Sequence, residues 1–338
     1  MQSSSRTIIF CLTELQGKYA PNDSLALYPC TFPNAPKSKH AKHFPIVLEY
    51  KLDKYPLKLS TNTKAFMDWK ERQIDLSNCL TRLLSALTNH HFFKEDEVID
   101  SGIWGITKTD DVDIEAKSQW VEEIYFWPEI GEDLHTDLPI AQSENLTAPI
   151  VSTIDSAIDS HYYFDGRHPE YPNEIVFPDC ASKALYAYTQ LDTKTQIKVD
   201  AITQLIDNGL ALIGRMKSLS FLSFVSAIEA LQKMIPTKEV SHCELCGQLR
   251  YEVSKRFVDF LSHYVSDSDE DKKIYKKIYG MRSEIAHKGG LLLGDAHQNW
   301  SRQTAQDREF KLLKITAQIT RVSLVNWLLE TSGTTINN

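Results

Sequence analysis

The chain has 338 residues, of which 42% are hydrophobic, and a formal net charge of −8. This length allows two domains of ordinary size, each with its own core. No run approaches the ~20 apolar residues of a membrane helix, and residues 1–16 fit neither a secretory signal nor an organelle-targeting peptide. The cysteines are few and scattered, which argues against a disulfide framework. We therefore expect a soluble, cytoplasmic protein with no membrane partner.

The charge is unevenly distributed along the chain. Residues 1–200 carry 19 Lys and Arg against 30 Asp and Glu, a net charge of −11, whereas residues 201–338 carry 18 against 15, a net charge of +3. The most acidic stretch is 91–160, with 17 acidic and 3 basic residues. Because this stretch would repel nucleic acid, we expect an anionic partner to bind the second half of the chain.

The N-terminal part mixes strand-like and helical patterns. Segments rich in Ile, Val, Phe, Tyr and Trp predict short strands at 7–15, 44–52, 98–107 and 120–127. Residues 66–87 predict a helix. Many Pro, Asn, Asp, Ser and His residues favour a loop at 20–43 and a domain linker at 160–178. We place the boundary near 175, after an acidic mixed α/β domain at 1–175 that is a candidate sensor or specificity domain.

From residue 176 onward the hydrophobic period is helical. The first apolar stripe consists of Ile197, Ala201, Leu205, Leu212 and Met216. Further stripes follow at 221–235, 245–264, 274–285 and 310–328. Pro236 ends the second helix, and Gly289-Gly290 ends the fourth. Consecutive amphipathic helices with short connections predict a bundle at 176–338, so the expected fold class is α+β: a mixed α/β domain followed by an all-α bundle.

The fourth predicted helix carries an arginine and a histidine five residues apart. With residues placed about 100° apart around the helix, Arg282 and His287 flank one face. The residues on that face are Lys272, Lys276, Tyr279, Ser283 and Ala286. The small side chains of Ser283 and Ala286 would leave room for a group between the arginine and the histidine.

An imidazole beside a guanidinium suits phosphodiester chemistry on RNA. The imidazole can take a proton from a ribose 2′-hydroxyl or deliver one to the leaving 5′-oxygen, and the guanidinium can neutralise charge on the phosphoryl oxygens. Such a reaction needs no metal or other cofactor, and its substrate must be RNA because DNA lacks the 2′-hydroxyl. The alternative is an ordinary helix end, where Arg, Lys and His complement the helix dipole.

Three segments of the second half match one known superfamily in order and spacing. The run from Ile278 to Gly290, IYGMRSEIAHKGG, resembles the Arg-x4-6-His signature of the HEPN superfamily, and most closely its Apea-like branch. The run from Phe224 to Leu231, FVSAIEAL, is similar to the second core helix of that branch. Lys255-Arg256-Phe257 stands where an Arg-bearing helix precedes the motif helix. The resemblance covers about residues 180–330.

This resemblance implies a helical domain that dimerises and brings two Arg-His pairs into one cleft. Many relatives are metal-independent endoribonucleases of toxin-antitoxin, antiviral or CRISPR-associated systems. The implied catalytic pair is Arg282 and His287, and the implied partners are RNA, a second copy of the chain and a regulatory or antitoxin protein. The residues expected to support RNA binding are Ser283, Tyr279, Lys272 and Lys276. Other members are scaffolds or bind nucleotides, so a non-catalytic dimerisation or nucleotide/partner-binding module is the alternative.

Three further features leave alternatives open. Glu229 lies in a very apolar helix, where it could hold Arg282 or Arg256 in place, or lie partly exposed at the helix edge. Cys243 and Cys246 have the spacing of half a zinc site, but a second cysteine pair is missing, which favours structural thiols. A phosphate-tracking surface with stacking aromatics, or a solvated lysine face, is predicted by Lys272, Lys273, Tyr275, Lys276, Lys277 and Tyr279.

Overall fold

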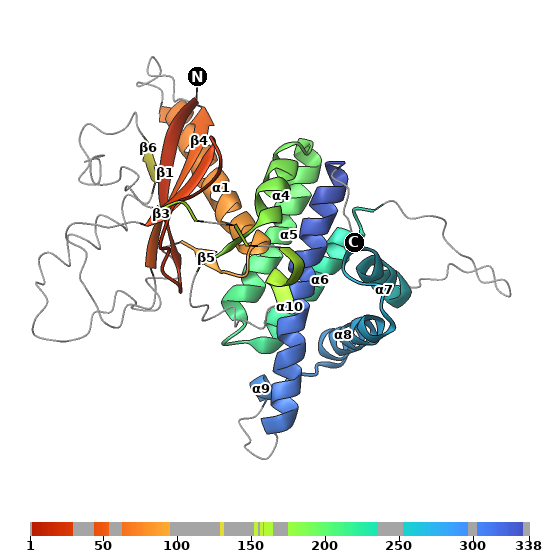
Figure 1. The fold of residues 1–338 in the computed structure, drawn as a ribbon. Coiled ribbons are helices and arrows are strands. Elements are labelled where there is room, and N and C mark those ends of the chain that lie inside the picture. The colour runs from red at the N-terminus through yellow and green to blue at the C-terminus, as the bar shows by residue number, and fades with distance from the viewer. Residues whose placement is uncertain are drawn as a thin grey trace, which may run out of the picture. The chain divides into compact units, whose positions relative to one another are not determined.

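The computed structural model describes residues 2–29, 44–53, 63–94, 129–131, 152–154, 156–157, 159–164, 175–235, 253–296 and 303–333. The fold is α+β, with an antiparallel sheet near the N-terminus and a mostly helical remainder (Figure 1). The chain divides into two compact units. The sheet unit contains the strands, and the helical unit consists mainly of the run from Lys183 onward, with short pieces at 85–89 and 160–165. No helix within the described ranges is both long and apolar enough to cross a bilayer.

The sheet unit is organised by two long paired strands. Strand β1 (Gln2–Cys11) runs antiparallel to β4 (Phe44–Asp53), in register from Gln2 opposite Asp53 to Cys11 opposite Phe44. The strand order is β2-β3-β4-β1-β5, and β6 also pairs with β1. The shorter strands are β2 (Tyr19–Asn22), β3 (Leu25–Pro29), β5 (Phe92–Phe93) and β6 (Glu129–Gly131). The structure thus confirms the strand predicted at 44–52 and the first part of the one predicted at 7–15, since β1 ends at Cys11. The strands predicted at 98–107 and 120–127 lie outside the described residues.

The prediction of a loop at 20–43 is wrong for its first part, which forms β2 and β3. Leu25, Leu27 and Tyr28 are buried on β3, and the Asn22 side chain accepts a hydrogen bond from the Ser24 backbone N–H in the turn between the strands. The Pro, Asn, Asp and Ser residues of this segment indicated a loop and masked the short alternation of buried side chains on β3. Pro21 is tolerated because β2 is an edge strand.

The segment predicted as a linker, 160–178, also contains regular structure. A 3-10 helix, η5, spans Asp159–Phe164, and β8 (Phe177–Pro178) pairs in parallel with β7 (Ser156–Ala157). The polar composition of this segment suggested a linker. The elements in it were not predicted because they are too short to show a hydrophobic period. By contrast, the helix predicted at 66–87 is confirmed as α1 (Thr63–Leu87). The Tyr50 hydroxyl of β4 donates to the Gln73 carbonyl of α1 at 3.2 Å and so ties this helix to the sheet.

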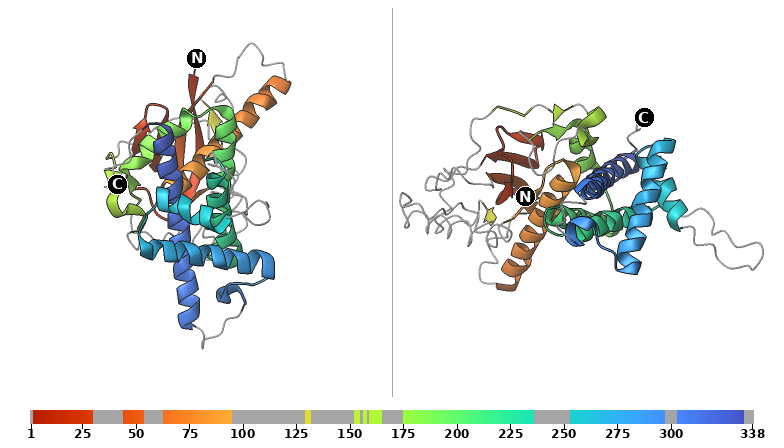
Figure 2. Two further views of the ribbon diagram at one scale, coloured as in Figure 1. Left: turned by 90° about the vertical axis from the view of Figure 1, so that its right-hand side faces the viewer. Right: turned by 90° about the horizontal axis from the view of Figure 1, so that it is seen from below.

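The helical unit confirms the helices predicted from periodicity. They are α5 (Thr193–Leu212), α6 (Lys217–Gln232), α7 (Val253–Tyr264), α8 (Asp269–Lys288) and α10 (Gln303–Thr331). Helices α4 (Asp179–Thr189) and α9 (Leu293–Ala296) were not predicted, and the part of the third stripe at 245–252 lies outside the described residues. Helix α6 is the centre of the unit and packs against α5, α7, α8 and α10. Its side chains Phe221, Phe224 and Ile228 are fully buried. Helices α7 and α8 run across the direction of α10 (Figure 2, left).

The apolar stripe predicted for α5 is on the wrong face of the helix. Ile197 is 64% exposed and Ala201 is also exposed, while Met216 lies beyond the end of α5 and precedes α6. The residues that enter the core are Val199, Ile202, Ile206 and Leu210. Helix α5 has apolar residues on two sides, and periodicity alone does not tell which side meets α6.

The core of the helical unit also contains a charged residue that the sequence did not single out. Arg321 of α10 is 1% exposed, and its Nε donates to the Ser85 carbonyl at 3.1 Å. Burial lowers the pKa of the guanidinium to about 10. The group is therefore still charged at neutral pH, and its hydrogen bond fixes the segment around Ser85 against α10.

The packing of α5 on α6 predicts opposite effects for two glycine substitutions. A Cβ added at Gly209 would lie 2.7 Å from the buried Phe224 ring, whereas one at Gly280 of α8 meets nothing within 4 Å. We expect Gly209→Ala to lower the free energy of unfolding by about 1–3 kcal/mol through overpacking. Gly280→Ala should raise it by about 0.5–1 kcal/mol through helix propensity. Urea unfolding measures both, and a Gly209→Ala protein as stable as the wild type would contradict this packing.

Candidate active site

Helix α8 has well-defined ends, which fix the positions of its functional side chains. At its start, the Ser268 side chain accepts a hydrogen bond from the Asp271 backbone N–H, and acidic residues fill the first turn. At its end, Gly289 adopts the left-handed conformation with φ 67° and closes the helix. The glycine stop predicted from the sequence is confirmed. Arg282 and His287 therefore lie in the last two turns of α8.

Arg282 connects two helices through Glu229 of α6. Its Nε lies 3.1 Å from Glu229 Oε1, and its Nη2 donates to Glu229 Oε2 at 3.3 Å. The two side chains are only 24% and 17% exposed. Of the two arginines considered as partners of Glu229, the structure pairs it with Arg282. This two-point ion pair fixes the plane of the guanidinium.

Arg282 also contacts His287 directly, through a 2.7 Å contact between Nη1 and His287 Nε2. A guanidinium can only donate hydrogen bonds, so Nε2 must accept and the ring proton resides on Nδ1. The imidazole in this arrangement is neutral. The sequence prediction had the two side chains flanking a face with room for a group between them. They meet because a long arginine side chain can bend toward the end of its own helix, which a helical wheel does not represent.

The hydrogen-bonding capacity of Arg282 is only partly used. A guanidinium has five N–H donors. Two of them form hydrogen bonds, with Glu229 Oε2 and His287 Nε2, and the Nε group lies at ion-pair distance from Glu229 Oε1. Two donors therefore remain for an anion. His287 is exposed, so the open side of the pair can be reached from solvent.

The supporting residues predicted on α8 differ in their surroundings. Ser283 is half-buried and Lys276 is exposed, whereas the ring of Tyr279 packs against Phe257 of α7 with centroids 5.4 Å apart. Lys272 is bound to Asp267 at 2.7 Å. This contact raises the pKa of Lys272 and lowers that of Asp267. Lys276 therefore has the more available charge for a phosphate.

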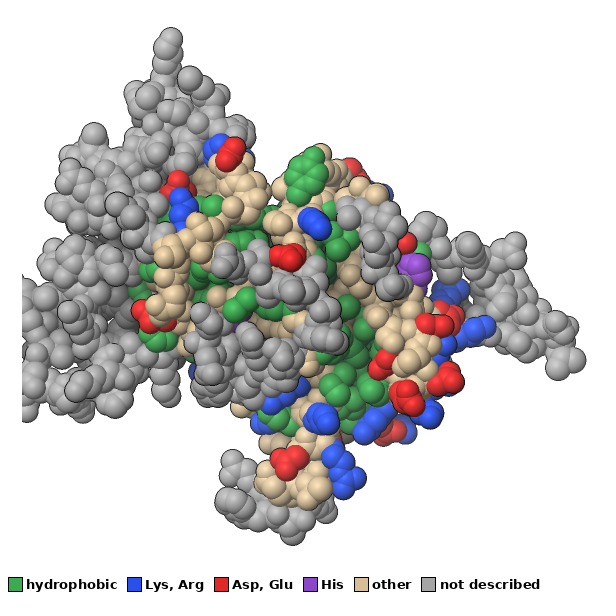
Figure 3. Space-filling model, in the orientation of Figure 1, with side chains coloured by type: hydrophobic (Ala, Val, Ile, Leu, Met, Phe, Trp, Pro, Cys, Tyr) green, Lys and Arg blue, Asp and Glu red, His purple; other side chains and the backbone are tan. Residues whose placement is uncertain are grey.

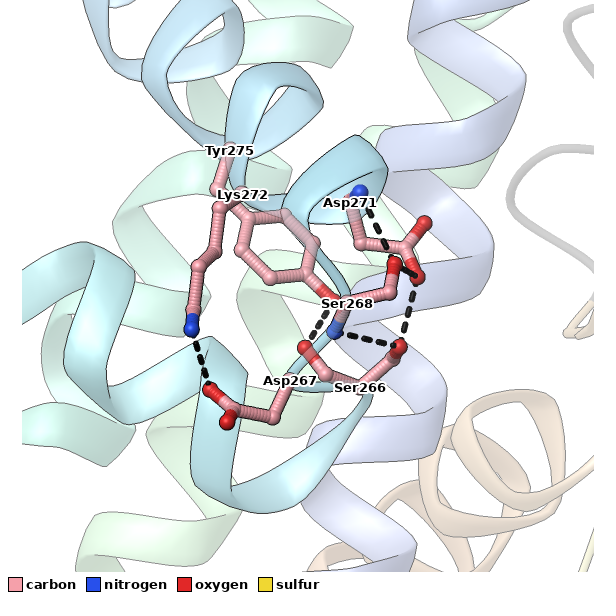
Figure 4. A network of polar contacts seen from close by, with 6 residues as sticks. All are labelled: Ser266, Asp267, Ser268, Asp271, Lys272 and Tyr275. Carbon is pink, nitrogen blue, oxygen red and sulfur yellow. Dashed lines mark hydrogen bonds and ion pairs between the residues drawn. The ribbon is translucent and has the colours of Figure 1, made fainter.

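Figure 4 shows why Tyr275 does not contribute to a stacking surface. This tyrosine is 1% exposed, and its hydroxyl donates to the Ser266 carbonyl at 3.1 Å. The neighbouring Ser266 and Ser268 hydroxyls both donate to the Asp271 carboxylate. These bonds shape the turn between α7 and α8. In Figure 3, Lys, Arg, Asp and Glu side chains mix over the region of α8, so this face is not a continuous basic surface.

The segment after His287 is fastened to the start of α6. The Asp295 carboxylate accepts hydrogen bonds from the backbone N–H groups of Lys217 and Ser218, at 2.9 and 2.6 Å. The Ser218 hydroxyl accepts one from the Leu292 backbone N–H at 2.8 Å. Burial opposes ionisation of Asp295, but these hydrogen bonds outweigh it and lower its pKa. Neither Asp295 nor Ser218 was predicted, because no local sequence pattern indicates that an aspartate caps residues 77 and 78 positions earlier in the chain.

Other candidates lie away from the Arg-His pair or outside the described residues. Arg256 lines a pocket with residues of α5, α6 and α10. Cys243 and Cys246 fall outside the described residues. Within the described ranges, no group of three or more His, Cys, Asp or Glu side chains could hold a metal ion.

Comparisons of the chain with known protein families, with curated proteins and with solved structures found no match. The resemblance to the HEPN superfamily therefore rests on the motif residues themselves, and the function drawn from it is a proposal.

The partly buried ion pair predicts a measurable coupling between Glu229 and Arg282. In a double-mutant cycle with alanine at both positions, we expect a coupling free energy of about 1–3 kcal/mol, because each charge left alone is poorly solvated. The matched control is the exposed pair of Glu284 and Lys288, 2.5 Å apart on α8, for which we expect about 0.3–0.5 kcal/mol. Equal coupling in the two pairs would contradict a structural role for Glu229.

Proposed function

We propose that this protein is a metal-independent endoribonuclease that cleaves single-stranded or looped RNA and acts as a homodimer. The observation that carries the proposal is the direct contact of Arg282 with both Glu229 and His287 Nε2. A guanidinium held by a carboxylate on one edge presents its remaining donors in a fixed direction. A neutral imidazole beside it offers a lone pair that can accept a proton.

In the proposed reaction His287 Nε2 removes the proton from a ribose 2′-hydroxyl. The hydroxyl must first replace the Arg282 Nη1 group as the donor to Nε2, because one lone pair accepts one proton. The 2′-oxygen then attacks the adjacent phosphorus, and the bond to the 5′-oxygen breaks. The resulting His287 imidazolium then gives this proton to the 5′-oxygen. The products are a 2′,3′-cyclic phosphate and a 5′-hydroxyl.

Arg282 stabilises the charge that develops on the phosphoryl oxygens in this scheme. Its Nε and Nη2 stay bound to Glu229, while Nη1, released from His287, turns its donors to the phosphate. Glu229 acts as a positioning residue, and Ser283, Tyr279 and Lys276 support the RNA chain beside the pair. We further propose a role as a defence or toxin effector, restrained by a regulatory or antitoxin protein, with the N-terminal unit as its sensor.

One observation favours a second candidate function, a non-catalytic binding module. With Arg282 donating to it, the lone pair of His287 Nε2 is occupied and not free to act as a base. A chain in which this contact persists would bind an anion or a partner protein without cleaving it.

Cleavage of RNA in the presence of EDTA distinguishes the two functions. We expect purified wild-type protein to cut total RNA and to leave 2′,3′-cyclic phosphate ends. His287→Ala and Arg282→Ala should each slow cleavage about 100-fold or more, the range for loss of a general acid-base or charge-stabilising group. The matched control is Lys288→Ala, which removes an exposed cation next to His287 and should cut at the wild-type rate.

Two outcomes would contradict the proposed nuclease activity. Cleavage that chelation abolishes would exclude the metal-independent mechanism. RNA left intact by the purified wild-type dimer, with binding of RNA or a partner retained, would establish the binding module instead.

A further inference from the structure

Two lysines from different helices lie together on one aromatic ring, and the proposed mechanism does not use them. Lys217 is the first residue of α6, and Lys314 lies on α10. Their ammonium nitrogens lie 6.0 and 4.5 Å from the centroid of the Phe310 ring. Contacts of both cations with a single ring keep the two charges close to each other, although their helices are far apart in the sequence. We call Lys217 and Lys314 the lysine pair.

The Lys217 side chain is held in place by helix α9. A Cβ added at Gly294 would lie 2.9 Å from Lys217 Cδ, so the alkyl stem passes closely over the backbone of α9. The Lys217 backbone N–H is fixed as well, because it donates to the Asp295 carboxylate. Within the described ranges, the ammonium group of Lys217 forms no hydrogen bond or ion pair. Because the stem is already ordered, a ligand that binds this charge loses little additional side-chain entropy.

The carboxylates around the lysine pair are already engaged. Asp295 accepts hydrogen bonds from the backbone at the start of α6. Glu309 accepts one from the Leu293 backbone N–H at 2.6 Å, and Asp307 accepts one from the Gln303 side chain at 2.9 Å. Against these three carboxylates, five cations lie around the start of α6 and on the first turns of α10, and they are Arg215, Lys217, Arg308, Lys311 and Lys314. The surface around the lysine pair is therefore net positive.

The segment that follows His287 leads from the candidate active site toward the lysine pair. His287 and Leu292 are five residues apart, so their Cα atoms lie at most about 18 Å from each other. The Leu292 backbone N–H donates to the hydroxyl of Ser218, the neighbour of Lys217. A few nucleotides of single-stranded RNA can span such a distance.

We propose that the lysine pair binds phosphate groups of the RNA chain several nucleotides away from the bond that Arg282 and His287 cleave. The RNA backbone fits this surface because it repeats its negative charge at every nucleotide, and two ammonium groups on different helices can contact separate phosphates. The inference rests on the proposed nuclease and specifies its substrate. That substrate is an extended RNA strand that reaches both places, and short fragments such as a dinucleotide lack the second contact.

Binding of a fluorescent RNA oligonucleotide of about 12 nucleotides tests the lysine pair without cleavage, in a His287→Ala parent protein. Lys217→Met and Lys314→Met keep an alkyl stem on the Phe310 ring but remove the charge. We expect each to weaken binding about 5–10-fold, as for loss of a hydrogen bond to a charged group. Each should also lower the slope of log K against log salt concentration by about 0.7. The matched control is Lys194→Met, exposed at the start of α5, which should bind like the parent.

Cleavage assays with substrates of two lengths then separate the lysine pair from the Arg-His pair. With His287 present, Lys217→Met and Lys314→Met should raise KM for the oligonucleotide about 5–10-fold, leave its kcat unchanged and leave cleavage of the dinucleotide UpA unchanged. If the wild type cuts neither RNA but the two lysine variants still weaken binding, the nuclease proposal fails and the RNA-binding surface stands. The inference is overturned if both variants bind the oligonucleotide like their parent with the same salt slope, or if they impair cleavage of UpA as much as that of the oligonucleotide.

Discussion

The geometry of the candidate active site depends on the ion pair between Glu229 and Arg282. Helix α6 is buried on nearly every side, and a carboxylate in such a helix is costly unless a cation compensates it. Arg282 provides that cation from α8 and contacts both carboxylate oxygens. The same contacts that make Glu229 tolerable in the core orient the guanidinium toward His287. The ion pair of Glu229 with Arg282 therefore both stabilises the buried carboxylate and positions the guanidinium.

Helix α6 also fixes the other end of this arrangement. The backbone N–H groups at its start bind Asp295, and its Ser218 hydroxyl binds the Leu292 backbone. These bonds fasten the segment that follows His287, while Glu229 near the end of α6 holds Arg282. The last turns of α8 are thus attached to α6 at both ends of that helix. An arginine and a histidine in the final turns of a free helix would have no such constraint on their mutual distance.

Much of the helical unit could be predicted from the sequence, because hydrophobic period and helix-ending residues act locally. The glycine stop of α8 was predicted in this way. The partner of Glu229 was narrowed to Arg282 or Arg256, and only the tertiary structure shows that it is Arg282. The face of α5 that meets α6 was not, because Val199 and Ile197 are equally apolar and only packing distinguishes them. Strands β2 and β3 were hidden by turn residues, and they form through tertiary pairing: β3 pairs with β4, and β2 pairs with β3.

The details of the site that were not predictable are those set by side-chain reach and by distant contacts. The contact of Arg282 with His287 depends on the bend of a long side chain. The burial of Tyr275 depends on a carbonyl in the preceding turn, and the capping by Asp295 depends on a residue 77 positions away. The grouping of Lys217 and Lys314 around the Phe310 ring likewise depends on tertiary packing.

The most direct test of this account is the tautomer of His287, read from the ¹⁵N NMR spectrum of its imidazole at a pH where the ring is neutral. We predict that the proton resides on Nδ1 and that Nε2 is unprotonated, because Arg282 donates to it. We also predict that this preference disappears in Arg282→Ala. A wild-type ring protonated on Nε2, or a tautomer unchanged by Arg282→Ala, would show that Arg282 does not donate to His287 and would contradict the proposed geometry of the site.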